Sequence, residues 1–88
     1  MVRFVKDPDA VLDYQVNWAD WLAGDTIATS TWIVPAGITQ DSESETMTAA
    51  TIWLSGGTLG ASYELVNRIT TAAGRTDDRT IRIELQSK

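Results

Sequence analysis

The 88-residue sequence contains no cysteine and no histidine. The lack of cysteine excludes disulfide bonds, thiolate metal sites and thiol redox chemistry. The lack of histidine removes the commonest general base and the commonest ligand of transition metals. No apolar run approaches the length of about 20 residues that a membrane-spanning helix needs. Acid–base catalysis would therefore depend on carboxylates alone, and we expect no cofactor.

Positive charge is also scarce. Seven Lys and Arg stand against twelve Asp and Glu, which gives a net charge of −5. Binding to a nucleic acid depends on neutralising phosphates, so we predict no nucleic-acid partner. The same balance disfavours docking on an anionic membrane surface. The N-terminal segment lacks the pattern of a signal peptide, which predicts synthesis in the cytoplasm.

The length predicts one domain, residues 1–88, near the lower limit for a chain that buries its own core. Short runs of alternating apolar and polar residues follow one another, with turn residues every 8 to 12 positions, as is typical of a sandwich or small barrel. The sequence thus predicts an all-β fold of about six to seven strands. The expected strands are residues 2–5, 10–18, 26–34, 38–47, 50–54, 62–70 and 79–85.

The last third of the chain contains the clearest strands. Residues 62–70 and 79–85 alternate around a Gly-containing turn, which predicts a hairpin, and residues 50–54 suggest a third consecutive antiparallel strand. Between residues 50–54 and Tyr63 lies a Gly-rich loop. We predict a tyrosine corner, in which the Tyr63 hydroxyl bonds to the backbone of this crossing loop. An ordinary half-buried tyrosine is the alternative.

Three other segments have distinctive patterns. In residues 26–34 we expect Trp32 to face the core, with a bulge that allows Ile27 to point inward as well. Residues 38–47 carry acidic residues at every second position, which predicts an exposed edge strand or a loop. The spacing of apolar residues from Trp18 to Leu22 predicts a single helical turn stopped by glycine.

Four tryptophans are many for a chain of 88 residues. Trp18 and Trp32 have mainly apolar neighbours two positions away, so we expect both in the core. Trp53 lies opposite the apolar face of its strand and is the strongest candidate for a contact surface, with Trp21 as a second interface candidate. Arg68, the third interface candidate, is expected on an outward face, where we predict that it stacks on Trp53 as a cross-strand partner.

Several carboxylates suggest a metal or catalytic site. Asp7, Asp9 and Asp13 would form a calcium site with Asp77 and Asp78 if the two segments met at one end of the sandwich. The alternative, which we favour, is that they are solvated turn residues, because aspartate readily populates turns.

A glycosidase-type carboxylate is the other possibility. Asp20 lies between Trp18 and Trp21, as an acid beside substrate-stacking aromatics would. A sandwich of 88 residues leaves little room for a substrate cleft, so we predict that the protein is not an enzyme.

Beyond these patterns, much of the sequence resembles a group of small proteins encoded in the structural-gene regions of tailed phages and prophages. Asn17 stands where the group usually has aspartate, which argues against a role for charge at that position. The resemblance rests on residues 6–14, 17–22, 24–27, 32–38, 53–57 and 67–79.

This resemblance implies an immunoglobulin-like or fibronectin-III-like sandwich of about seven antiparallel strands. It also implies a non-enzymatic virion protein, in capsid decoration, the head–tail joint or the tail, that contacts other virion proteins. We expect a homo-oligomer or many copies on the particle. The alternative is a carbohydrate-binding or host-surface-binding module that uses aromatic residues near Trp18 and Trp21.

Overall fold

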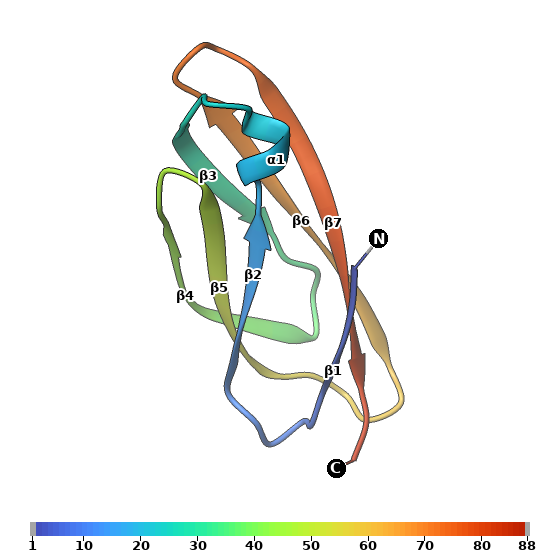
Figure 1. Cartoon of the computed structure of the whole chain (residues 1–88). Helices are drawn as coiled ribbons and strands as arrows, with labels where there is room; N and C mark the ends of the chain where they lie inside the picture. Colours follow the sequence, from blue (N-terminus) through green and yellow to red (C-terminus); the bar gives the residue numbers. More distant parts are fainter. Residues whose placement is uncertain (1, 88) are drawn as a thin grey trace.

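Alternating apolar and polar residues form the strands of the computed structural model, which describes residues 2–87 (Figure 1). A single turn of helix, α1 (Ala19–Leu22), follows the second strand. Among residues 2–87 there is no helical segment with the length and hydropathy that a membrane span requires. The strands are β1 (Val2–Lys6), β2 (Leu12–Asn17), β3 (Ile27–Ile33), β4 (Ile38–Glu45), β5 (Ala49–Gly56), β6 (Ser62–Thr71) and β7 (Thr76–Leu85).

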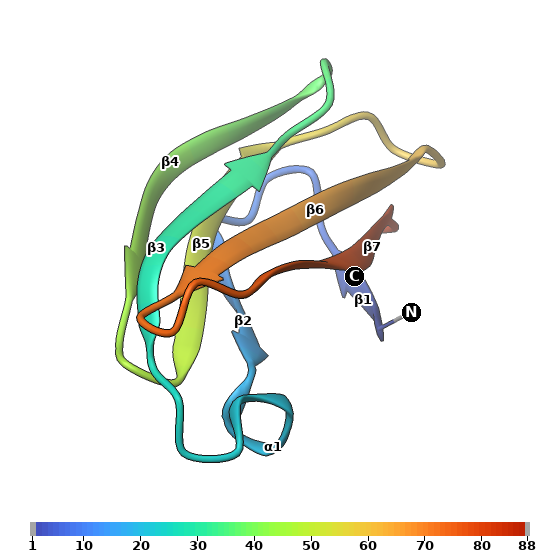
Figure 2. The same ribbon diagram turned by 90° about the horizontal axis from the view of Figure 1, so that it is seen from above.

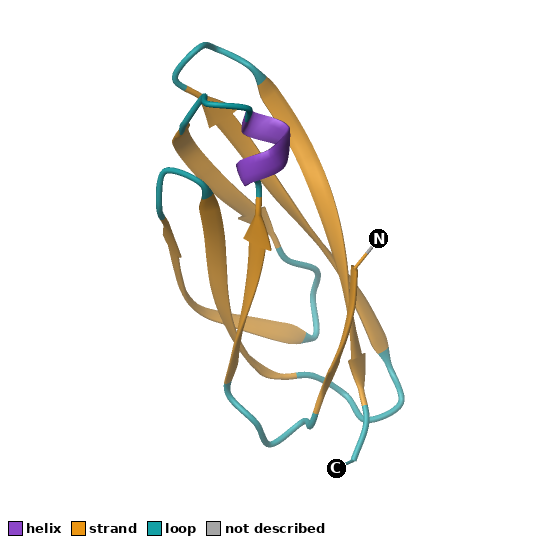
Figure 3. Ribbon diagram, in the orientation of Figure 1, coloured by secondary structure: helices purple, strands orange, loops and turns teal. Residues whose placement is uncertain are grey.

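The strands form two sheets that pack face to face (Figures 2 and 3). One sheet has the order β1-β7-β6-β3 and the other β2-β5-β4. The predicted all-β sandwich with seven strands is confirmed. One pairing departs from the antiparallel expectation, since β1 runs parallel to β7. The immunoglobulin-like subtype stays a prediction, because other sandwiches share these layers and this number of strands.

The core lies between the sheets and is built from every second residue of the strands. Ile52 and Leu54 of β5 face Leu65 and Ile69 of β6, and all four side chains are fully buried. Burying an apolar side chain of this size contributes roughly 1.5–3 kcal/mol, so these alternating positions supply most of the driving force for folding.

The expectation of three consecutive antiparallel strands at the C-terminal end is wrong. The hairpin of β6 and β7 forms as predicted, but β5 belongs to the other sheet. The Gly-rich segment 57–61 carries the chain from one sheet to the other. Gly57 has a φ of +95°, and a Cβ there would lie 2.8 Å from Leu85, so the crossing requires glycine. Alternation identifies a strand but does not identify its neighbour.

The bulge predicted in residues 26–34 is present. The register between β3 and β6 shifts between Ile27 and Thr29. The extra residue turns both Ile27 and Trp32 toward the core, where both are buried. A strict period of two would have placed them on opposite faces.

The acidic segment, predicted to be either an exposed edge strand or a loop, forms an edge strand. β4 pairs only with β5 and lies beside β3 at one margin of the sandwich (Figure 2). Glu43 and Glu45 stand opposite the core residues Ile52 and Ala50 in the register, yet both are exposed. Acidic residues on the core-side face of an edge strand discourage another strand from pairing there.

The predicted helical turn is α1. It ends at Ala23, which has a φ of +50° in the left-handed region and donates its N–H to the carbonyl of Ala19. Gly24 follows with a φ of +96°, so the stop uses two left-handed residues where the sequence pointed to glycine alone.

Candidate interaction surface

Trp53 is exposed on the outer face of the three-stranded sheet. Its neighbours Ile52 and Leu54 point into the core, so the alternation of β5 turns the indole outward, where 41% of the residue is accessible. In the register, Trp53 stands opposite Asp13 of β2 and Ser42 of β4. Directly opposite residues of an antiparallel pair share a face, so the indole lies between two polar side chains.

A second carboxylate reaches this face from β4. The register of β4 shifts between Gln40 and Ser42, which leaves Asp41 at the bulge. Asp41 Oδ1 accepts a hydrogen bond of 3.1 Å from the hydroxyl of Ser55, two residues after Trp53 on the same face. We call this surface the Trp53 face, made of Asp13, Gln15, Asp41, Ser42, Thr51, Trp53 and Ser55.

The charge of this sheet has one sign. β2, β4 and β5 contain four acidic residues, all exposed, and no Lys or Arg. None of the four takes part in an ion pair within residues 2–87. The acidic residues are Asp13, Asp41, Glu43 and Glu45.

The alternative of a sugar-binding module with stacking rings near Trp18 and Trp21 is not supported by how the two rings lie. Trp18 is fully buried and donates its indole N–H to Asn67, and the guanidinium of Arg79 covers its ring at 4.4 Å. Trp21 is half-buried, meets Trp18 edge to face at 5.3 Å, and carries the guanidinium of Arg75 at 4.3 Å. Trp18 is thus closed to a ligand, and Arg75 already occupies a face of Trp21, which leaves Trp21 less suited to an interface than Trp53.

Trp32 and Tyr63 both lie at the positions that the sequence predicts for them, in the core and at the crossing loop. Trp32 is buried in the core. The Tyr63 hydroxyl accepts a hydrogen bond of 3.1 Å from the backbone N–H of Thr58 in the crossing loop, which is the contact of a tyrosine corner. Hydrogen bonding to Thr58 also lowers the pKa of the Tyr63 phenol.

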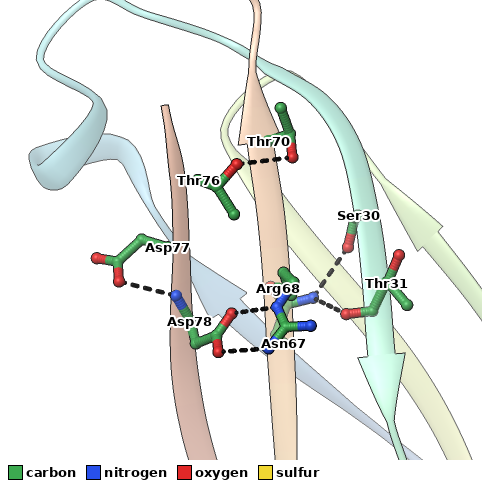
Figure 4. Close-up of polar contacts among 8 residues, drawn as sticks. All are labelled: Ser30, Thr31, Asn67, Arg68, Thr70, Thr76, Asp77 and Asp78. Carbon is green, nitrogen blue, oxygen red and sulfur yellow. Dashed lines mark hydrogen bonds and ion pairs between the residues drawn. The ribbon is translucent and has the colours of Figure 1, made fainter. Parts of the chain in front are cut away.

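Arg68 does not stack on Trp53, and that prediction is wrong. Arg68 lies on β6 of the four-stranded sheet, where its Nε and Nη2 donate to the two carboxylate oxygens of Asp78 at 2.8 and 3.0 Å (Figure 4). This bidentate pair lowers the pKa of Asp78. The cross-strand partnership assumed that β5 and β6 were neighbours, and they belong to different sheets.

The two groups of aspartates considered as a calcium site do not come together. Asp7 and Asp9 lie in the loop between β1 and β2 and Asp77 and Asp78 near the hairpin of β6 and β7, at opposite ends of the sandwich (Figure 1). Asp7 accepts the N–H of Asp9, and Asp77 accepts the N–H of Asp78. Within residues 2–87, no three carboxylates gather as metal ligands. Asp7 and Asp77 accept backbone N–H groups instead, and Asp78 pairs with Arg68.

One cluster was not predicted from the sequence. Asp25 Oδ2 lies 3.3 Å from Nη2 of Arg75, which also donates to the carbonyl of Leu22 at 2.9 Å. Hydrogen bonds, first from the side chain of Thr71 and then from the backbone of Thr26, lower the pKa of Asp25. The cluster ties the segment after α1 to the hairpin of β6 and β7. Its partners are about 50 residues apart in the chain, so no local pattern could have revealed it.

A model of a known protein family matches residues 6–84 of the chain and carries the description Podophage GP4 fiber-tail adaptor protein gp77. The matched range contains β2 to β6 entirely, and with them the whole Trp53 face. No curated protein matches the sequence.

Proposed function

Because the chain belongs to the family of podophage fiber-tail adaptor proteins, we propose that it joins a tail fibre to the tail through protein–protein contacts. Family membership makes the chain a structural component of a phage tail and so of the virion, and it confirms the predicted resemblance to small phage structural proteins. Among the three locations expected from the sequence, it favours the tail over capsid decoration and the head–tail joint.

The observation that supports a contact function is the exposed indole of Trp53. Trp18 and Trp32 are buried and Trp21 is half-buried, so these three contribute to folding. The outward-facing part of Trp53 adds nothing to the core. Tryptophan is enriched among the residues that dominate binding energy at protein interfaces. We assign the Trp53 face to the contact with one of the two partners.

We further propose that the protein acts without catalysis, and that many copies are present on each particle. The Trp53 face is the outer surface of a sheet, and Asp20, the residue that suggested a glycosidase, is exposed beside the half-buried Trp21. Binding is all that an adaptor requires. Repeated presentation on a symmetric particle favours closed, symmetric contacts between copies. We place its synthesis in the cytoplasm of the bacterial host.

Purified virions test this function. Mass spectrometry and immunogold labelling are expected to detect the protein at the junction of tail and fibre. Deletion of its gene is expected to yield particles that keep their tails and lose their fibres, with recovery when the wild-type gene is supplied in trans. Label over the capsid, or fibres retained after deletion, would contradict the proposal.

A further inference from the structure

The charges of this chain are segregated along the sequence. No Lys or Arg occurs between Lys6 and Arg68, whereas nine of the twelve acidic residues do, the other three being Asp77, Asp78 and Glu84. The fold converts this block into one layer, because all three strands of the β2-β5-β4 sheet come from it. The Trp53 face is therefore the outer surface of a layer without basic residues.

The basic residues of the opposite layer have partners within the chain. Arg68 pairs with Asp78, and Arg82 and Arg3 both approach Glu84, at 3.5 and 3.7 Å. The remaining basic residues within 2–87 also have partners in the chain: Arg75 with Asp25, Arg79 with the carbonyl of Asn17, and Lys6 with the carbonyls of Asp7 and Gly56. A second copy of the chain thus presents no described cation that is free to meet the acidic layer.

We propose that the Trp53 face binds a basic surface on a different protein, and that an arginine of this partner stacks on the indole of Trp53 between Asp13 and Asp41. This inference rests on the proposed adaptor function and specifies the chemistry of one of its two partners. An indole face attracts a guanidinium, and a carboxylate beside it accepts the guanidinium N–H groups. Asp13 is the direct cross-strand neighbour of Trp53, so the carboxylate and the ring are within reach of one guanidinium.

The chain already contains this arrangement once, beside α1 and the turn between β6 and β7. The guanidinium of Arg75 lies 4.3 Å from the ring of Trp21 and pairs with the carboxylate of Asp25. Trp53 and Asp13 repeat the ring and the carboxylate on the surface, without an arginine from the chain itself. The side chain of Lys6 is buried and its ammonium donates to the carbonyls of Asp7 and Gly56, so it does not reach the surface to occupy this position.

The test measures binding of the full chain to the purified fibre protein and, separately, to the purified tail proteins of the same phage. One of the two is expected to bind with a Kd that rises about tenfold between about 50 and about 500 mM NaCl. Asp13→Asn is expected to weaken that binding about tenfold at low salt, and Trp53→Ala about 30-fold. Both positions are exposed, so the variants are expected to keep the melting temperature of the wild type.

Glu64→Gln is the matched control. Glu64 is also an exposed strand carboxylate without an ion pair in residues 2–87, but it lies on the four-stranded sheet. Its variant is expected to bind as the wild type does. Equal losses for Asp13→Asn and Glu64→Gln, or binding that is lost in Trp53→Ala yet insensitive to salt, would overturn this inference and leave the adaptor function standing. Failure of the wild type to bind either preparation would overturn both.

Discussion

The indole nitrogen of Trp18 donates a hydrogen bond of 2.9 Å to Oδ1 of Asn67, and both side chains are fully buried. Trp18 follows directly after β2 and Asn67 lies on β6, so the bond connects the two layers of the sandwich. The amide nitrogen of Asn67 in turn donates to the hydroxyl of Ser30 and the carbonyl of Thr31 (Figure 4). A fully bonded polar group inside an apolar core specifies one alignment of the elements that meet there.

Replacing the asparagine tests this alignment. Asn67→Leu keeps the branched shape of the side chain but leaves the buried indole N–H of Trp18 without an acceptor, which costs about 1–3 kcal/mol of the free energy of unfolding. Urea denaturation followed by tryptophan fluorescence measures the loss. In a Trp18→Phe background, which has no N–H to satisfy, Asn67→Leu is expected to cost less. An equal cost in both backgrounds would show that the bond contributes nothing to stability.

The crossing loop provides a matched pair of glycine substitutions. Gly57 and Gly60 both have positive φ, of +95° and +83°, so alanine strains the backbone at each position by about 1–2 kcal/mol. Only at Gly57 would the added Cβ meet Leu85, at 2.8 Å, and overpacking of this kind costs about a further 1–3 kcal/mol. In thermal and urea unfolding, Gly57→Ala should be clearly less stable than Gly60→Ala. Equal stability would mean that Leu85 moves aside freely.

Tryptophan substitutions separate folding from binding. Trp32→Ala empties a buried core position and is expected to reduce the free energy of unfolding by about 3–5 kcal/mol. Trp53→Ala removes a side chain from the outer face and is expected to change it far less. Circular dichroism during thermal unfolding compares the two variants. A comparable loss at both positions would indicate that Trp53 is needed for folding, which would remove the main support for its contact role.

The pH dependence of stability isolates Asp25. Its pKa lies below its ordinary value of 3.8 because Thr71 and the neighbouring donors stabilise the charged carboxylate. At a pH just below 3.8, the native state therefore binds fewer protons than the unfolded state. The stabilisation from Asp25 is complete above the unfolded-state pKa and is lost as the pH falls through the native pKa. The melting temperature of Asp25→Asn should lie below that of the wild type near neutral pH, and the gap should narrow below about pH 4.

Asp78 is the control for this titration. Its pKa is lowered by Arg68, so the carboxylate is expected to lose its own contribution in the same acid range. Asp78→Asn therefore reports on the ion pair of the outer face, whose effect falls with added salt because the pair is exposed. The Asp25 contribution should be less sensitive to salt, since backbone N–H groups and Thr71 supply most of it. A gap for Asp25→Asn that persists at pH 2 would contradict this account.

Some features of this protein follow from local sequence because the direction of a side chain is a local property of the backbone. Alternation with a period of two placed Trp53 outside and Ile52 and Leu54 inside, and it required the bulge that turns Ile27 and Trp32 to the same side. The run of alternating acids marked β4 as an edge. The directions of the side chains in a β-strand follow from its own backbone, whichever strands lie beside it.

The sequence by itself thus determined the strands, the faces they bury, the absence of thiol and imidazole chemistry, and the block of chain without basic residues. Only the tertiary structure decided which strands are neighbours: it separated β5 from β6, paired Arg68 with Asp78, brought Asp25 to Arg75, and kept Asp7 away from Asp77. Pairing depends on how whole faces pack and on where a loop crosses between sheets. The free energy that selects one pairing of strands over another is shared among segments tens of residues apart, so no local stretch of sequence encodes it.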